Sequence, residues 1–168
     1  MQSIFSLFSP YRYVVNKEIT KLEKLLNSYN KKILEIGCGK NSYKKKFPKS
    51  DWTATDINFE GDADLITDAT DLKFSDNQFD VIICISVLEH IFEYQKALKE
   101  IRRVLKKKGI LILSTPFIFP YHDYPGDYWR FSDQAIKKLL KDYKSVKIKN
   151  LNLGWWRLPS GIFAIAKK

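Results

Sequence analysis

Residues 31–39 read Lys-Lys-Ile-Leu-Glu-Ile-Gly-Cys-Gly, and they decide the fold. An apolar run typical of a β-strand contains an acidic residue, Glu35, and continues into a turn with glycines at positions 37 and 39. A second strand-like run, residues 52–55, ends in Asp56. A strand, a glycine turn and an acidic residue about twenty positions further on predict a nucleoside-binding half of an α/β sheet.

The turn favours a cationic ligand with a ribose over a dinucleotide. Asn41 replaces the third glycine of the dinucleotide fingerprint, and Glu35 would repel a phosphate but attract a positive charge. Asp56 can accept hydrogen bonds from both ribose hydroxyls. S-adenosylmethionine has a ribose, a cationic sulfonium and no phosphate, so we expect it as the ligand. An ordinary βα turn would have the same local pattern.

Further motifs follow in a fixed order along residues 65–113. They are Asp68, Leu72-Lys73-Phe74, Phe79-Asp80, Leu88-Glu89-His90 and a Lys106-Lys107-Lys108-Gly109 turn before an apolar run. Together with the glycine turn, this order resembles the class I S-adenosylmethionine-dependent methyltransferases, in particular the type 11 subgroup. The resemblance covers residues 31–117.

The resemblance implies an α/β fold, a compact Rossmann-like sheet that is mostly parallel, with seven strands and an antiparallel final hairpin. Apolar runs predict strands near residues 32–37, 52–57, 64–67, 79–86, 109–115, 145–151 and 161–166. Periodic apolar residues predict an amphipathic N-terminal helix after Ser9-Pro10 and helices near 92–106 and 133–142. The connections on either side of the second strand are too short for full crossover helices. A thinly covered sheet edge is therefore expected, which favours a homodimer.

One domain is expected over residues 1–168, and its composition is that of an ordinary globular protein. It divides into a helical segment (1–30), a cofactor-binding core (31–117), and a substrate loop with a helix and the final strands (118–168). The two cysteines indicate reduced thiols and a cytoplasmic location. No apolar run is long enough to span a bilayer, and no signal peptide is recognisable. The apolar start, residues 4–8, could touch a membrane surface.

The net charge of +10 admits nucleic acid as a partner. The basic residues are mostly lysines in short runs along the whole chain, and such runs are usually solvated surface. No recognisable nucleic-acid module accompanies them. Nucleic acid is therefore kept as a secondary expectation.

The resemblance also implies which residues contact the cofactor. They are Glu35, Gly37, Cys38 and Gly39 for the methionine part, Asp56 for the ribose, Ile57, Asp68 and Ala69 for the adenine, and Ser86 for the sulfonium region. For Asp68, an Asx turn is the ordinary structural alternative.

Residues 120–133 form the candidate substrate loop. The loop follows the fifth strand, at the sheet edge where α/β folds bind ligands, and it is rich in polar aromatic residues. It resembles a His-x-x-Pro-x-Asp-Tyr-x-Arg-Phe signature of type 11 methyltransferases in surface-glycan and glycolipid pathways. The residues expected to bind the acceptor are Tyr121, Asp127, Tyr128, Trp129 and Arg130. A structural role, with Trp129 as a plug and Asp127 paired with Arg130, fits the loop equally well.

The chain has two histidines, and a hydroxyl acceptor benefits from a general base. His122, in the substrate loop, is the better candidate. His90 follows the fourth strand, and a structural role at the start of a helix is its alternative. Glu89, His90 and His122 could also hold a metal, but their pattern is not diagnostic, so no metal is predicted.

The expected function is methyl transfer from S-adenosylmethionine to an oxygen, with nitrogen as the secondary expectation, of a small-molecule, glycan or glycolipid-type acceptor. Two alternatives remain: a methyltransferase acting on RNA or protein, and a non-catalytic S-adenosylmethionine-binding accessory protein. The Asn-Pro-Pro-Tyr type of motif found in amino-directed nucleic-acid methyltransferases is absent after the fourth strand, where the chain reads Ser86-Val87-Leu88-Glu89.

Overall fold

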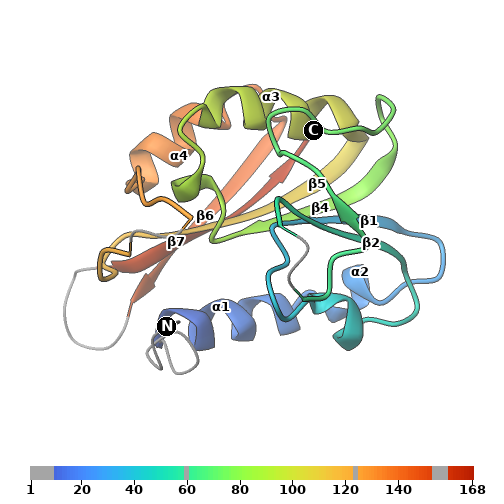
Figure 1. Ribbon diagram of the computed structural model, residues 1–168, viewed down its shortest axis with the longest axis horizontal. Coiled ribbons are helices and arrows are strands. Elements are labelled where there is room, and N and C mark those ends of the chain that lie inside the picture. The colour runs from blue at the N-terminus through green and yellow to red at the C-terminus, as the bar shows by residue number, and fades with distance from the viewer. Residues whose placement is uncertain (1–9, 59–60, 123–124, 153–158) are drawn as a thin grey trace.

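The computed structural model describes residues 10–58, 61–122, 125–152 and 159–168. Within these residues a seven-stranded sheet has the order β3-β2-β1-β4-β5-β7-β6 (Figure 1). The strands are β1 (Lys32–Ile36), β2 (Asp51–Asp56), β3 (Leu65–Ile66), β4 (Phe79–Ile85), β5 (Leu105–Pro116), β6 (Ser145–Asn152) and β7 (Pro159–Lys167). The first five are parallel, and β7 is antiparallel to both β5 and β6. The predicted α/β sheet with an antiparallel final hairpin is confirmed.

Helices cover both faces of this sheet (Figure 1). α3 (Tyr94–Val104) and α4 (Asp133–Leu139) pack on one face, and α1 (Pro10–Thr20), α2 (Glu23–Leu26) and the short 3-10 helix η2 (Tyr43–Lys46) lie on the other. Because β1 and β4 are covered on both sides, their central residues are buried and, apart from Glu35, apolar, as expected for interior parallel strands.

The start of the fifth strand differs from the prediction. β5 begins at Leu105, which pairs with Phe79, and the register shifts before Val81 pairs with Ile110. The residues predicted as a turn, Lys106 to Gly109, therefore form an irregular first part of β5, in which Lys108 has a left-handed φ of +67°. α3, at Tyr94–Val104, is shorter than the helix predicted near 92–106. A separate 3-10 helix, η3 (Leu88–His90), precedes it.

Where the structure describes them, the two connections on either side of β2 contain no full crossover helix, as predicted. η2 is the helical element between β1 and β2, and the described residues between β2 and β3 contain no helix. β3 has two residues, and its side chains, Leu65 and Ile66, are exposed at the sheet edge. Ser9, which directly precedes the predicted N-terminal helix, and the apolar start, residues 4–8, lie outside the described residues. Among the described helices, none is long and apolar enough to cross a membrane.

Tyr11 of α1 is fixed to the sheet by a chain of hydrogen bonds. Its side chain is buried, and its hydroxyl lies 2.8 Å from Ser114 Oγ of β5. Ser114 Oγ donates to the Ile162 carbonyl at 2.8 Å, so Tyr11 is the donor to Ser114. Ser86 Oγ donates in turn to the Tyr11 oxygen at 3.4 Å. α1 is thereby held against the carboxyl ends of β4 and β5.

We predict that Tyr11→Phe destabilises the fold, because the buried Ser114 hydroxyl loses its donor. The expected loss is about 1 kcal/mol in the free energy of unfolding, measured by urea denaturation. Tyr13→Phe is the matched control, since Tyr13 is on the same helix and 70% exposed. Equal losses in both variants would contradict the assigned role of the Tyr11 hydroxyl.

Candidate functional site

The glycine turn after β1 has the conformation that only glycine adopts readily. Gly37 has φ +68° and Gly39 has φ +56°. A Cβ at Gly37 would lie 2.3 Å from a methyl of Val87, so this position needs glycine for packing as well. A Cβ at Gly39 would meet no atom within 4 Å, so the turn borders open space there. This is the space in which a ligand could approach the backbone closely.

Asp56 lies beside that space at the carboxyl end of β2. Its Oδ2 accepts the Gly39 N–H at 2.8 Å, and its Oδ1 accepts the Asn58 N–H at 3.2 Å. The carboxylate is only partly buried, and the neighbouring Ile57 side chain is 57% exposed. Asp56, the residue predicted for the ribose, thus lies at the edge of the glycine turn, and Ile57, one of the residues predicted for the adenine, follows it directly in the chain.

Glu35 is buried beneath the turn and is fully engaged with the protein itself. Its carboxylate accepts hydrogen bonds from Ser42 Oγ at 2.5 Å, from the Tyr43 N–H at 3.1 Å and from Trp52 Nε1 at 3.0 Å. Burial raises the pKa of Glu35, and these three donors oppose that rise. Its observed role is to hold the segment after the turn in place, and its contact with the methionine part stays a prediction.

The other predicted cofactor residues lie nearby in differing environments. Asp68 is exposed, and its Oδ1 accepts the Thr70 N–H at 2.7 Å, which is the Asx turn named above as its alternative. Ala69 and Cys38 are buried, and burial raises the pKa of the Cys38 thiol to about 12. Ser86, at the end of β4, has a strained left-handed φ of +56°. The cofactor contacts of these four residues stay predictions.

The two histidines come from different segments and face each other. Their Nε2 atoms are 3.4 Å apart. His90 Nδ1 is hydrogen-bonded to the Gly126 carbonyl. His122 Nδ1 lies 3.2 Å from the Pro120 carbonyl and 3.3 Å from Asp127 Oδ2. The predicted pair of catalytic candidates therefore forms one cluster, and burial lowers the pKa of His90.

Glu89 adds a buried carboxylate to this cluster. Its Oε1 is 3.8 Å from His90 Nε2, and neither of its side-chain oxygens has a hydrogen-bond partner among the described residues. Burial raises its pKa to about 8. The backbone carbonyl of Glu89 accepts the N–H groups of Tyr128 and Trp129, at 2.9 and 3.2 Å. The substrate loop is thereby tied to η3.

The predicted acceptor-binding residues surround one pocket of about 270 Å³. Its lining consists of Phe119, Tyr121, Asp127, Tyr128, Trp129 and Arg130. Asp127 is hydrogen-bonded to Arg130 through both oxygens, and this pair holds the pKa of the Asp127 carboxyl below its usual range. The structural alternative is present too, since the Trp129 ring packs against Tyr94 with centroids 5.1 Å apart.

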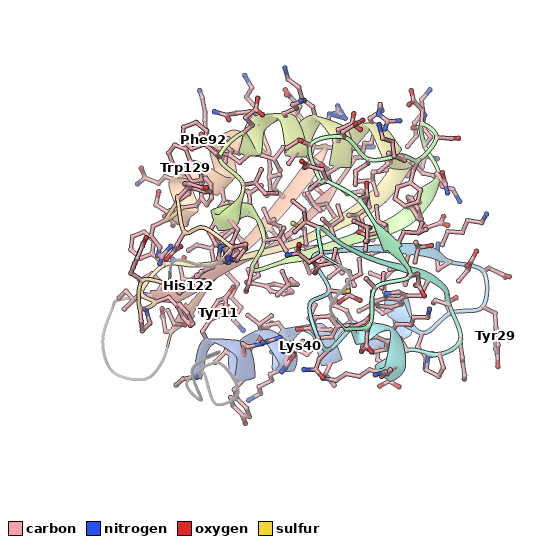
Figure 2. All side chains as sticks on the ribbon, viewed as in Figure 1. Tyr11, Tyr29, Lys40, Phe92, His122 and Trp129 are labelled. Carbon is pink, nitrogen blue, oxygen red and sulfur yellow. The ribbon has the colours of Figure 1, made fainter. Side chains whose placement is uncertain are left out.

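Figure 2 shows that His122, Tyr11, Trp129 and Phe92 lie at the same end of the molecule, whereas Tyr29 lies at the opposite end. Three residues of this region were not singled out from the sequence as binding residues: Tyr11, Phe119 and, except as part of a metal pattern, Glu89. Glu89 could have been recognised from the sequence, because an acidic residue directly beside a candidate catalytic histidine is a local signal. Phe119 stands in an apolar run and Tyr11 at the start of an amphipathic helix, and in neither place does the local sequence indicate a site.

A scan against known families matches residues 34–113 to the methyltransferase domain of type 11. The match runs from β1 into β5, the strands whose ends carry the glycine turn, Asp56 and Ser86. An uncharacterised protein of Methanocaldococcus jannaschii is 35% identical over 99 residues. That alignment covers 55% of this chain and 44% of the relative, so the chain matches less than half of its curated relative's length.

Solved structures share the fold at low sequence identity. A crystal structure described as a SAM-dependent methyltransferase from Archaeoglobus fulgidus superposes with a TM-score of 0.73 at 15% identity, covering 99% of this chain and 100% of its own. Another, from Methanosarcina mazei, has a TM-score of 0.64 at 21% identity, with coverage of 86% and 95%. Fold, motif order and family match agree: over residues 34–113 the chain is similar to the type 11 methyltransferase domain, and its fold is that of solved S-adenosylmethionine-dependent methyltransferases.

Proposed function

We propose that this protein transfers the methyl group of S-adenosylmethionine to an oxygen of a small-molecule or glycan-like acceptor. The observation that carries the proposal is the pairing of Asp56 with the Gly39 N–H beside the open space over Gly39. The Asp56 carboxylate can accept hydrogen bonds from ribose hydroxyls, and the glycines of the turn leave the backbone open to close approach. Both features suit a nucleoside that carries no phosphate.

The residues around the glycine turn would hold the cofactor, which supplies an already activated methyl group on its sulfonium. Asp56 would accept from the ribose, Ile57 and Ala69 would contact the adenine, and the backbone of residues 37–39 would line the methionine part. The main contribution of this chain is then positioning, which can supply several kcal/mol of the barrier reduction in a bimolecular transfer.

The acceptor would occupy the pocket of the substrate loop. Aromatic side chains offer faces for stacking, and the Asp127–Arg130 pair offers polar contacts at the same wall. Trp129 adds a buried indole N–H that has no hydrogen-bond partner among the described residues. Protein atoms cover that N–H, so the polar contacts for a glycan-like acceptor would come from the Asp127–Arg130 pair.

Proton removal from the acceptor hydroxyl falls to the histidine cluster. His122 contacts two residues that line the pocket, Phe119 through its ring and Asp127 through its backbone N–H. As a general base it would contribute roughly a hundredfold to ten-thousandfold in rate. His90 lies beside it on the η3 side, with the two Nε2 atoms 3.4 Å apart.

We predict that Asp56→Ala weakens S-adenosylmethionine binding, measured by calorimetric titration. Loss of hydrogen bonds to a charged acceptor costs about 1.5–3 kcal/mol, so the dissociation constant should rise roughly tenfold to hundredfold. Asp51→Ala is the matched control, because Asp51 is the exposed residue at the other end of the same strand. Unchanged affinity in Asp56→Ala, or no binding by the folded wild type, would argue against the cofactor site.

We predict that Tyr121→Ala reduces methyl transfer to a glycan acceptor without changing cofactor affinity. The assay follows labelled methyl from S-adenosylmethionine into a panel of methyl glycosides, with RNA and protein as parallel acceptors. Loss of an aromatic contact in the pocket should lower kcat/KM about tenfold. Tyr29→Ala is the control, since Tyr29 is 78% exposed and Tyr121 76%. Transfer to RNA or protein alone would replace the glycan proposal with the alternative acceptor class.

A further inference from the structure

The two histidine rings present lone pairs to each other. His90 Nδ1 contacts the Gly126 carbonyl, and a carbonyl only accepts, so this nitrogen carries the ring proton. His122 Nδ1 has only acceptors around it as well, the Pro120 carbonyl and the Asp127 carboxylate. In the neutral rings each Nε2 is then an unprotonated acceptor. Two such nitrogens 3.4 Å apart repel each other unless a positive charge lies between them.

A carboxylate without a partner lies next to this pair. Glu89 is 1% exposed, its Oε1 is 3.8 Å from His90 Nε2, and both its oxygens lack hydrogen bonds among the described residues. A buried carboxylate in that condition is costly, so native proteins pair it or use it to bind an ion. Glu89 therefore points independently to a cation at the same place.

We propose that Glu89, His90 and His122 bind one divalent first-row transition-metal cation, through the Nε2 atom of each histidine and the carboxylate of Glu89. Metal–nitrogen bonds of 2.0–2.1 Å in tetrahedral geometry put two ligand nitrogens about 3.3 Å apart, close to the separation found here. Two histidines and one carboxylate are a ligand set of catalytic zinc sites, which keep a further position open. The acceptors on both Nδ1 atoms would orient the rings as outer partners of metal-binding histidines do.

Asp127 is the competing carboxylate. His90, His122 and Asp127 offer ligand atoms within 4.8 Å of one another. Both Asp127 oxygens, however, are already bonded to Arg130, whereas both Glu89 oxygens are free of hydrogen bonds to the described residues. Glu89 is outside that group of three, so its carboxylate would have to move closer to His122 to bind the same cation. We assign the third ligand to Glu89 because no other described residue occupies its oxygens, with Asp127 as an outer partner of His122.

The cation would act on the acceptor, and this role rests on the proposed function, whereas cation binding does not. The cluster lies next to the pocket, through the contacts of His122 with Phe119 and Asp127. A cation there would draw electron density from an acceptor hydroxyl and ease the loss of its proton to solvent. The histidines would then serve as ligands, and His122 would act as a base only in the metal-free protein.

The test is a calorimetric titration of the chelator-treated full chain with ZnCl₂ at neutral pH. Wild type should bind one Zn²⁺ per chain, His122→Ala should abolish this binding, and Glu89→Gln should weaken it on the order of a hundredfold. Glu100→Gln and Cys38→Ser are controls, and both should bind as wild type does. Glu100 is a carboxylate paired with Arg103, and Cys38 is a thiol outside the cluster.

Absence of Zn²⁺ binding by folded wild type, or unchanged binding in His122→Ala or Glu89→Gln, would overturn the proposal. Circular dichroism of each variant separates loss of the site from loss of the fold. The visible absorption of bound Co²⁺ gives a second readout, since it should disappear in His122→Ala. Zn²⁺ binding without S-adenosylmethionine binding would remove the proposed function and keep the cation site, and the reverse result would remove the cation site alone.

Discussion

The buried carboxylate of Glu35 is the interaction on which the cofactor half of the structure depends. Only the short helix η2 connects β1 to β2, so little apolar helix surface is available to fix the glycine turn against the sheet. Glu35 replaces that packing with hydrogen bonds to Ser42, Tyr43 and Trp52, which reach across the turn and into the neighbouring strand. A polar anchor of this kind is directional, so it sets the path of the turn more tightly than apolar contact alone.

The part of the structure proposed to bind the acceptor depends on a second anchor, the backbone of η3. Its carbonyl at Glu89 holds two N–H groups of the substrate loop, while Val87, just before it, packs against Gly37 of the glycine turn. The segment after β4 thus contacts both halves of the site. A shift of η3 would move the histidine cluster and the floor of the cofactor region together. The positions of the two parts of the site are therefore coupled through η3.

Much of the fold could be predicted from local sequence, and the misses share one cause. Long apolar runs and strand-end acids are local signals, so the strands and the position of Asp56 follow from them, whereas the antiparallel final hairpin was predicted from the family resemblance. The start of β5 does not, because Leu105 joins the sheet through a register shift against Phe79 that periodicity cannot detect. Within the site, Glu89 and His90 were adjacent in sequence, but the bond between Tyr11 and Ser114 joins residues 103 positions apart. The partnership of Glu35 with Trp52 likewise needs the parallel pairing of two strands.

The hydroxyl chain from Ser86 to Ile162 has a fixed direction. A carbonyl cannot donate, so Ser114 must donate to Ile162, and Tyr11 must donate to Ser114. The lone pairs of the Tyr11 oxygen are then always turned toward Ser86, at the strand end where the sulfonium is expected. The fold thus holds a permanently oriented dipole, with its negative end toward Ser86 and the expected place of the sulfonium charge. Burial raises the pKa of Tyr11 above its usual value, so the group stays a neutral dipole and is not lost to ionisation.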